Sequence, residues 1–276
     1  MASSFPARLH AILAREAPVG LVLRRGPANA LCSLLWDRRS DRFELGQWVR
    51  ARIYERRADI SPDGRHWIYF ARNSRWSSET RGSYTAVARV PWMKAIVLLG
   101  KGDCWQGGGL FTSDSRYWVN GGCCHFPIRD SSEVELDQKF SPTQSYGGEC
   151  PGVYYLRLQR EGWLLRDRLS AGVSGEFTVF EKFAPSHWIL RKYAHSEVGP
   201  PPGRGCHWDE HELEHRESHR RIQLPKWEWA DVDGETVVWA ENGCLHRASL
   251  GGEGLAEVRV LFDFNGMKFE ACPAPY

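Results

Sequence analysis

The segment of this sequence that comes nearest to a catalytic pattern is His211-Glu212-Leu213-Glu214-His215, which spells H-E-x-x-H. In that pattern two imidazoles on one face of a helix bind zinc, and the first glutamate acts as general base. His219 continues the spacing and could add a third ligand. A polar turn follows, however, as in a β-hairpin, and on a strand two residues four apart stand about 13 Å from each other, too far to bind one ion. We therefore expect a strand here and keep zinc at His211 and His215 as an alternative.

A second group of possible metal ligands consists of Cys206, His207, Asp209 and His211. Cys123-Cys124-His125 could join it from a long loop. The chain has 8 Cys without any C-x-x-C spacing, and adjacent cysteines are a poor spacing for metal ligands. Small buried side chains are the commoner role of such cysteines. The sequence therefore predicts no metal and no other cofactor.

Several carboxylates fall on segments that we expect to be inner strands of a repeat, where two of them could serve as acid and nucleophile or base of a glycosidase. Their alternative role is structural, as hydrogen-bond acceptors for neighbouring turns, and the repetition of Ala-Asp before a turn favours this role. The sequence has no G-x-x-x-x-G-K-[ST] loop for phosphate and no G-x-S-x-G elbow of a serine hydrolase. The carboxylates are Glu55, Asp59, Glu176, Glu181, Glu228 and Asp231.

The composition narrows the classes of partner. The formal charge is +2, from 36 basic and 34 acidic residues spread along the chain, so no basic stripe favours nucleic acid. No apolar stretch is long enough for a secretory signal or a membrane span, and the cysteines show no disulfide framework. We expect a cytoplasmic, monomeric protein that binds neither nucleic acid nor membrane.

Short β-like runs follow one another from Gly20 onward in groups of three, each group a meander. The groups recur every roughly 40 to 50 residues, which is the spacing of propeller blades. The third group, which includes Val153 to Leu158 as a strand, is longer because residues 121–152 form an inserted loop. A further strand precedes the second to fifth groups. The centres of the first strands are Val22, Trp67, Trp118, Trp188 and Val237.

One turn in this repeat carries a more specific pattern, Ser61-Pro62-Asp63-Gly64-Arg65. Ala58-Asp59-Ile60 before it is echoed by Ala230-Asp231-Val232 before Asp233-Gly234. This combination resembles the WD-repeat-like blades of TolB-type β-propeller proteins. The resemblance implies a propeller scaffold of the kind that mostly binds other macromolecules, and it carries no catalytic residue across.

We therefore predict an all-β protein with a single domain over residues 1–276, a five-bladed β-propeller of four-stranded antiparallel blades. A short helix is expected over Phe5 to Glu16, in an extension of residues 1–18, because Leu9, Ile12 and Leu13 have helical spacing. The first blade lacks its innermost strand. Either Gly266 to Cys272 or the N-terminal segment could supply it.

In such a repeat the short turns share one rim and the long loops share the other. The long loops contain aromatic and Arg residues of the kind that anchor protein interfaces, so we expect the binding face there. The alternative is that these side chains fold back as small local cores. The candidate binding residues are Trp76, Arg81, Asp103, Trp105, His125, Arg129, Tyr146, Glu149, Arg204, His207 and Trp208.

The function predicted from the sequence is a non-catalytic interaction module that binds another protein. The alternative is a hydrolase, with either a carboxylate pair in the central funnel or zinc at His211 and His215, where Cys206 could be a further ligand. Removal of metal by chelation separates the zinc alternative from the others.

Overall fold

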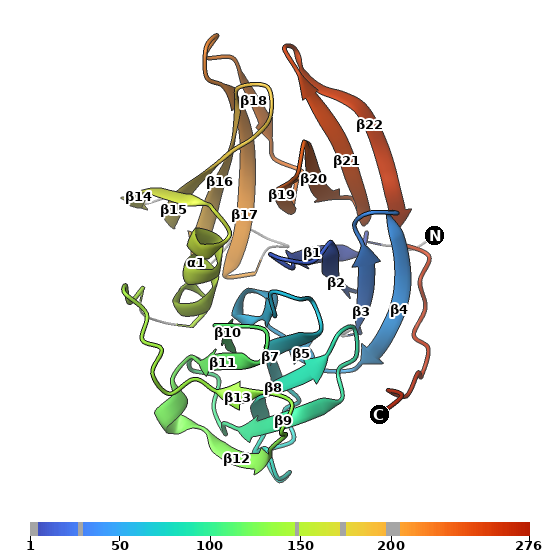
Figure 1. Cartoon of the computed structure of the whole chain (residues 1–276), viewed down its shortest axis with the longest axis vertical. Coiled ribbons are helices and arrows are strands. Elements are labelled where there is room, and N and C mark those ends of the chain that lie inside the picture. Colours follow the sequence, from blue (N-terminus) through green and yellow to red (C-terminus); the bar gives the residue numbers. More distant parts are fainter. Residues whose placement is uncertain (1–4, 27–29, 147–148, 172–174, 197–204) are drawn as a thin grey trace. The chain divides into compact units, whose positions relative to one another are not determined.

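The computed structural model describes residues 5–26, 30–146, 149–171, 175–196 and 205–276. Within these ranges the chain is mainly β-strand, and the single α-helix is α1 (Pro151–Arg160) (Figure 1). The prediction of an all-β protein is confirmed at this level. The chain divides into two compact units. Unit 1 comprises Met1–Phe5, Ala11–Arg157 and Met267–Tyr276, and unit 2 comprises Pro6–His10 and Leu158–Gly266.

The first sheet has the order β1-β2-β3-β4. The helix expected over Phe5 to Glu16 is wrong, because this segment contains the strand β1. All four residues from Leu9 to Ile12 are buried, and a short apolar run that is covered on both faces fits a strand and a helix equally well. The N-terminal segment thus supplies a fourth strand to this sheet, while Gly266 to Cys272 contains no strand. The strands are β1 (Arg8–Leu13), β2 (Val19–Arg25), β3 (Leu31–Asp37) and β4 (Arg42–Val49).

The second sheet has the order β12-β9-β8-β7-β5, and β6 also pairs with β7. The Ser61 to Gly64 turn between β6 and β7 forms as predicted, with the Gly64 amide donating to the Ser61 carbonyl at 2.9 Å and Gly64 at φ +76°. The sheet is larger than four strands because the inserted segment returns a strand to its edge. The strands are β5 (Arg52–Ile53), β6 (Asp59–Ile60), β7 (His66–Arg72), β8 (Ser83–Arg89), β9 (Ala95–Gly100) and β12 (Phe126–Arg129).

The third sheet differs most from the prediction. It has three strands, β10 (Gly109–Phe111), β11 (Arg116–Val119) and β13 (Glu135–Leu136), and β11 and β13 are parallel. The strand expected over Val153 to Leu158 is wrong, since these residues lie in α1. Pro151 occupies the first helical position, and the buried positions 153, 154, 157 and 158 share one face of a helix.

Unit 2 contains two antiparallel sheets, one of five strands and one of four. The first includes β14, whereas the sequence predicted a strand over Trp163 to Arg168 as the last of the third group. The dipeptide Asn242-Gly243 is a strong sequence signal for a two-residue hairpin, and the hairpin between β20 and β21 forms there, with φ of 51° and 76° at its two residues. The strands are β14 (Leu164–Ala171), β15 (Gly175–Phe183), β16 (Trp188–Ser196), β17 (His207–His215), β18 (Arg221–Leu224), β19 (Trp229–Asp233), β20 (Thr236–Glu241), β21 (Cys244–Gly251) and β22 (Gly254–Asp263). Of the five sheets that the described residues form, two have four strands, so the sheets are not uniformly four-stranded as we predicted.

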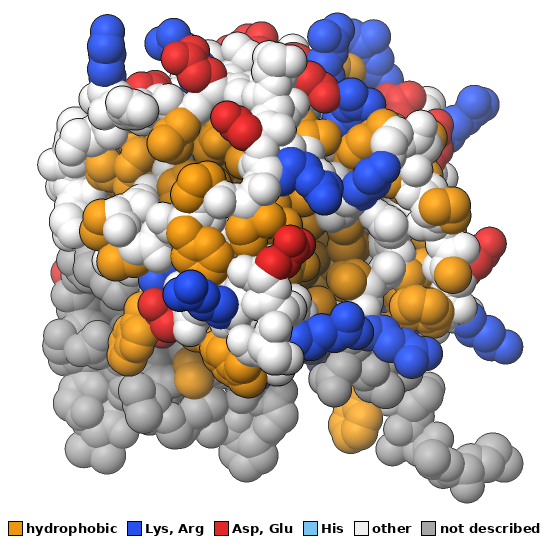
Figure 2. All heavy atoms as spheres, turned by 90° about the horizontal axis from the view of Figure 1, so that it is seen from below, with side chains coloured by type: hydrophobic (Ala, Val, Ile, Leu, Met, Phe, Trp, Pro, Cys, Tyr) orange, Lys and Arg blue, Asp and Glu red, His pale blue; other side chains and the backbone are white. Residues whose placement is uncertain are grey.

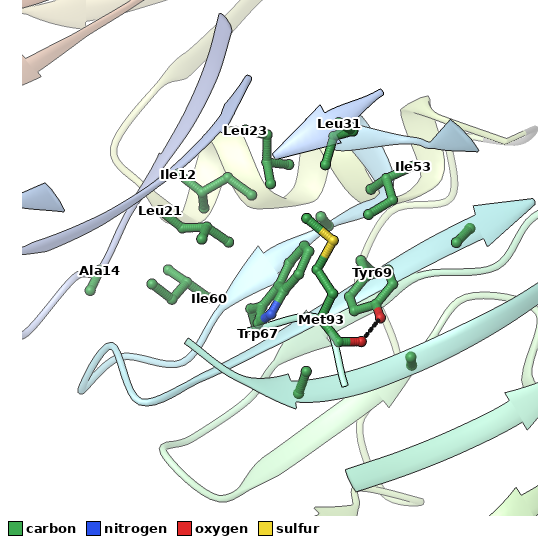
Figure 3. Packing of buried hydrophobic residues seen from close by; sticks show 14 of the residues in the cluster. Ile12, Ala14, Leu21, Leu23, Leu31, Ile53, Ile60, Trp67, Tyr69 and Met93 are labelled. Atoms are coloured by element: carbon green, nitrogen blue, oxygen red, sulfur yellow. Dashed lines mark hydrogen bonds between the residues drawn. The ribbon is translucent and has the colours of Figure 1, made fainter. Parts of the chain in front are cut away.

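The main hydrophobic core of unit 1 lies where residues of the first and second sheets meet. Ile12 and Leu21 pack with Trp67 and Tyr69 in this cluster, and Figure 3 shows their side chains turned toward one another. Two aromatic residues of this cluster have hydrogen bonds for their polar atoms: the Trp67 indole donates to the Trp92 carbonyl at 2.7 Å, and the Tyr69 hydroxyl donates to the Met93 carbonyl at 2.6 Å. The strands that carry the long loops of unit 1 are therefore anchored in a dense core.

Candidate functional site

Five of the predicted binding residues come together in unit 1, on three loops that touch one another. We call this set the loop cluster. It comprises residues 73–83, which connect β7 and β8, residues 100–108, which connect β9 and β10, and residues 121–126, which lead through the short 3-10 helix η2 (Gly122–Cys124) into β12. The five residues are Trp76, Arg81, Asp103, Trp105 and His125.

His125 joins two of the loops to strand β8. Its Nδ1 lies 3.0 Å from the Gly121 carbonyl oxygen, and its Nε2 lies 2.9 Å from the Thr85 hydroxyl, which accepts the Gly108 amide at 2.9 Å. A carbonyl only accepts hydrogen bonds, so Nδ1 carries the proton and Nε2 accepts from Thr85. Burial lowers the pKa of His125 to about 4. The imidazole is therefore neutral near pH 7 and serves as a structural link.

Asp103 fixes the loop of residues 100–108. Both of its carboxylate oxygens accept from the Lys101 ammonium, at 2.8 and 2.9 Å, and one also accepts from the Trp105 amide at 2.8 Å. The Lys101 side chain is buried, and a buried ammonium is costly unless it is paired. The Asp103 carbonyl accepts from the Ser83 hydroxyl, which ties this loop to the end of residues 73–83. Asp103 thus holds the backbone that presents Trp105.

Arg81 and Trp76 shape the loop of residues 73–83. The Arg81 guanidinium lies 4.8 Å from the centre of the Phe126 ring, a cation–π contact between two loops. Gly82 has φ +88°, and a Cβ there would overlap the Trp76 indole, so glycine lets the indole lie against the backbone. Trp76 is 55% exposed and Trp105 is 71% exposed. The cluster therefore presents two indoles to solvent from loops whose backbone is held internally.

Glu149 and Tyr146 have structural contacts elsewhere in unit 1. Glu149 pairs with the fully buried guanidinium of Arg57, which also donates to the carbonyls of Cys104 (2.8 Å) and Gln106 (2.5 Å). Arg57 therefore supports the 100–108 loop from beneath. The sequence analysis did not identify Arg57 as a residue that supports the site. The signal that could have pointed to it is its position directly before Ala58-Asp59-Ile60, which is buried.

The Tyr146 and Tyr155 rings pack edge to face, with centroids 5.3 Å apart. Arg129, on β12, donates to the Ala95 carbonyl at 2.9 Å along the edge of the second sheet.

The remaining candidate residues belong to unit 2 or lie outside the described residues, as Arg204 does. Trp208 is 8% exposed and stacks on His195, with ring centroids 4.5 Å apart and planes 4° from parallel. This geometry makes Trp208 a packing residue of β17, which does not support its predicted binding role. His207 is half-buried, and Cys206 is exposed beside it.

The H-E-x-x-H segment lies on strand β17, as the sequence predicts, without the helix that its zinc chemistry needs. The His211 ring nitrogen Nδ1 lies 2.9 Å from the Trp227 carbonyl, and Glu212 pairs with Arg191. His215 contacts the Ser218 hydroxyl at 3.0 Å. Among the residues that the structure describes, no group of three or more His, Cys, Asp or Glu side chains is arranged to hold a metal ion.

The carboxylates considered for glycoside chemistry have structural partners wherever their side chains are described. Asp59 accepts from the Phe111 amide at 2.7 Å, and Asp231 pairs with Lys182 at 2.7 Å. Glu181 lies between two guanidinium groups, and together they lower its pKa against the opposing effect of burial. Glu55 and Glu228 lie 3.3 and 3.7 Å from Arg25 and Arg8. The side chain of Glu176 lies outside the described residues.

Figure 2 shows the face seen from below in Figure 1, where β9 and β12 lie. Apolar side chains gather on this face, with Lys and Arg side chains among them. No helix in the described part of the chain has both the length and the apolar character needed to cross a membrane.

Comparison with models of protein families gives no match to this chain, and comparison with curated proteins gives none either. The arguments for a function therefore come from the geometry of the chain itself.

Proposed function

We propose that the five sheets are the blades of a propeller and that the chain is a non-catalytic module that binds another protein through the loop cluster. The succession of antiparallel meanders and the Ser61 to Gly64 turn support the propeller. The even balance of charge and the exposed indoles support a protein partner over nucleic acid.

The observation that carries the proposal is the exposure of Trp76 and Trp105 on loops that are already ordered. Tryptophan is enriched among the residues that dominate protein interfaces, because one indole buries a large area at little cost in side-chain entropy. The Lys101–Asp103 pair and the Arg57 hydrogen bonds fix the loop backbone before any partner arrives. Less ordering at the moment of binding leaves more of the contact free energy as affinity.

The test is capture of a partner from an extract of the source organism by the tagged full-length chain, with quantitative mass spectrometry of the captured proteins. Trp76→Ala and Trp105→Ala should each reduce capture of the same protein at least tenfold, the loss of about 1.4 kcal/mol or more that a central interface tryptophan supplies. The control is Phe183→Ala, because Phe183 is 54% exposed and lies in unit 2. It should leave capture unchanged.

The proposal fails if both tryptophan variants capture the partner as the original chain does. It also fails if Phe183→Ala reduces capture equally, because the effect would then belong to exposed aromatic residues in general. Equal melting temperatures of the four proteins are needed for either conclusion, and the exposure of all three side chains leads us to expect them.

A further inference from the structure

Cys123 and Cys124 form a pair of neighbouring thiols on the 3-10 helix η2. Their Sγ atoms lie 3.5 Å apart, and both residues are exposed. The segment is held on both sides: the Cys124 amide donates to the Gly121 carbonyl at 3.1 Å, and His125 follows with its own hydrogen bonds to Gly121 and Thr85. The two sulfur atoms are therefore kept together at the surface of the protein.

The other cysteines of the described chain do not share this arrangement. Cys32 and Cys150 are buried, and burial raises the pKa of both thiols, which keeps them in the unreactive protonated form. Cys206 is exposed, and in the described part of the chain the two cysteine sulfurs in contact with each other are those of Cys123 and Cys124. Cys123 and Cys124 are thus both exposed, and each has a second sulfur 3.5 Å away.

We propose that Cys123 and Cys124 are a redox-modified dithiol, which a small-molecule disulfide of the glutathione class converts into a disulfide between the two adjacent residues. This inference does not depend on the proposed binding function.

The chemistry is thiol–disulfide exchange in two steps. Either sulfur of the pair can donate the hydrogen bond that joins them, and we take Cys123 as the attacking sulfur. The Cys123 thiolate attacks one sulfur of the small disulfide, forms a mixed disulfide and releases one small thiolate. The Cys124 thiolate then attacks the Cys123 sulfur, closes the protein disulfide and releases the second small thiolate. The two protons of the cysteines end on the two released thiols, and the small disulfide accepts the two electrons.

Proximity favours the second step. A sulfur held 3.5 Å away attacks in an intramolecular reaction, which proceeds far faster than attack by a free thiol. Adjacent residues have Cα atoms about 3.8 Å apart, closer than the usual range for a disulfide, so the ring is strained. Strained and exposed disulfides are the readily reduced ones, and we therefore expect the bond to be reversible.

The experiment treats the full-length protein with oxidised glutathione, blocks free thiols by alkylation and maps the products by mass spectrometry. The original chain should show an internal disulfide in the peptide that contains residues 123–124, with two small thiols released per chain and no glutathione retained there. Cys124→Ser should stop after the first step and retain glutathione on Cys123. Reduced glutathione in excess should restore both thiols in the original chain.

Cys206→Ser is the matched control, because it removes an exposed cysteine that is not part of the pair, and it should behave like the original chain at residues 123–124. Retention of glutathione on either cysteine of the original chain would overturn the proposal. So would alkylation of both thiols to the same extent before and after treatment. Both substitutions are at exposed positions, and melting curves should confirm that the variants fold.

Discussion

His125 makes the stability of unit 1 depend on pH. Its pKa is about 4 in the folded chain and 6.5 in the absence of burial, so between these values the unfolded chain binds more protons. The stabilisation that neutral His125 gives the folded chain is fully present above pH 6.5. As the pH falls toward 4, the free energy of unfolding decreases by up to about 3 kcal/mol. Urea denaturation at a series of pH values from 7 to 4 measures this loss.

His125→Gln is the control for that prediction, since glutamine keeps a polar side chain and does not titrate. It should be less stable than the original chain near pH 7 and should lose less stability on acidification. Parallel curves for the two proteins would show that other groups cause the dependence.

The sequence shows which residues have a type suited to binding, but it does not show which of them are exposed and which are packed in a core. Trp105 and Trp208 both lie near long loops and looked alike as candidates, yet one is exposed and the other is packed on His195. The difference depends on the register of β16 and β17, which pairs residues 195 and 208, and a single sequence does not reveal that pairing. The support from Arg57 depends likewise on contacts between residues more than 40 positions apart.

At the scale of elements, we expect Trp208 and Trp105 to contribute differently to stability, because Trp208 packs within the β16–β17 pair and Trp105 is exposed. Trp208→Ala removes a buried indole from the pair and should lower the free energy of unfolding by about 3 kcal/mol, while Trp105→Ala should change it by less than about 0.5 kcal/mol. Chemical denaturation of both variants measures the difference. Equal destabilisation would contradict the packing role of Trp208.

Hairpins were the elements that the sequence predicted best. Ser61-Pro62-Asp63-Gly64 and Asn242-Gly243 specify turns through positive φ at glycine or asparagine, a local property that sequence expresses directly. Two predictions of element type were wrong. The predicted helix over Phe5 to Glu16 contains the strand β1, and the predicted strand over Val153 to Leu158 lies in the helix α1. Residues 9–12 are buried at four consecutive positions, so no periodicity distinguishes a strand from a helix there. Residues 151–160 do have buried positions on one helical face, but the short apolar run from Val153 to Leu158 also fits a strand.

At the scale of the whole molecule, unit 1 is closed by the last ten residues of the chain. The Tyr276 ring lies 4.4 Å from the Arg89 guanidinium, and its hydroxyl donates to the Lys94 carbonyl at 2.7 Å. The Phe269 ring lies 5.8 Å from Trp48 and 4.9 Å from the Arg50 guanidinium. These contacts attach the tail to the first and second sheets of unit 1.

We expect the double variant Phe269→Ala, Tyr276→Ala to destabilise unit 1 by about 2 kcal/mol and to leave unit 2 unchanged, because both side chains contact unit 1. Hydrogen exchange resolved by peptide is the measurement. Amides of β4 and β8 should exchange faster, and those of β20 and β21 should not. Faster exchange throughout the chain would instead mean that the tail stabilises both units.

The discontinuity of both units has a consequence for biosynthesis. When the ribosome has translated residues 11–157, unit 1 still lacks the tail that docks on its sheets, and unit 2 has received only the five residues Pro6–His10. Domains made of one continuous segment can fold in turn as they emerge, but here the segment that completes unit 1 is translated only after residues 158–266 of unit 2. Unit 1 therefore stays incomplete for as long as residues 158–266 are being translated.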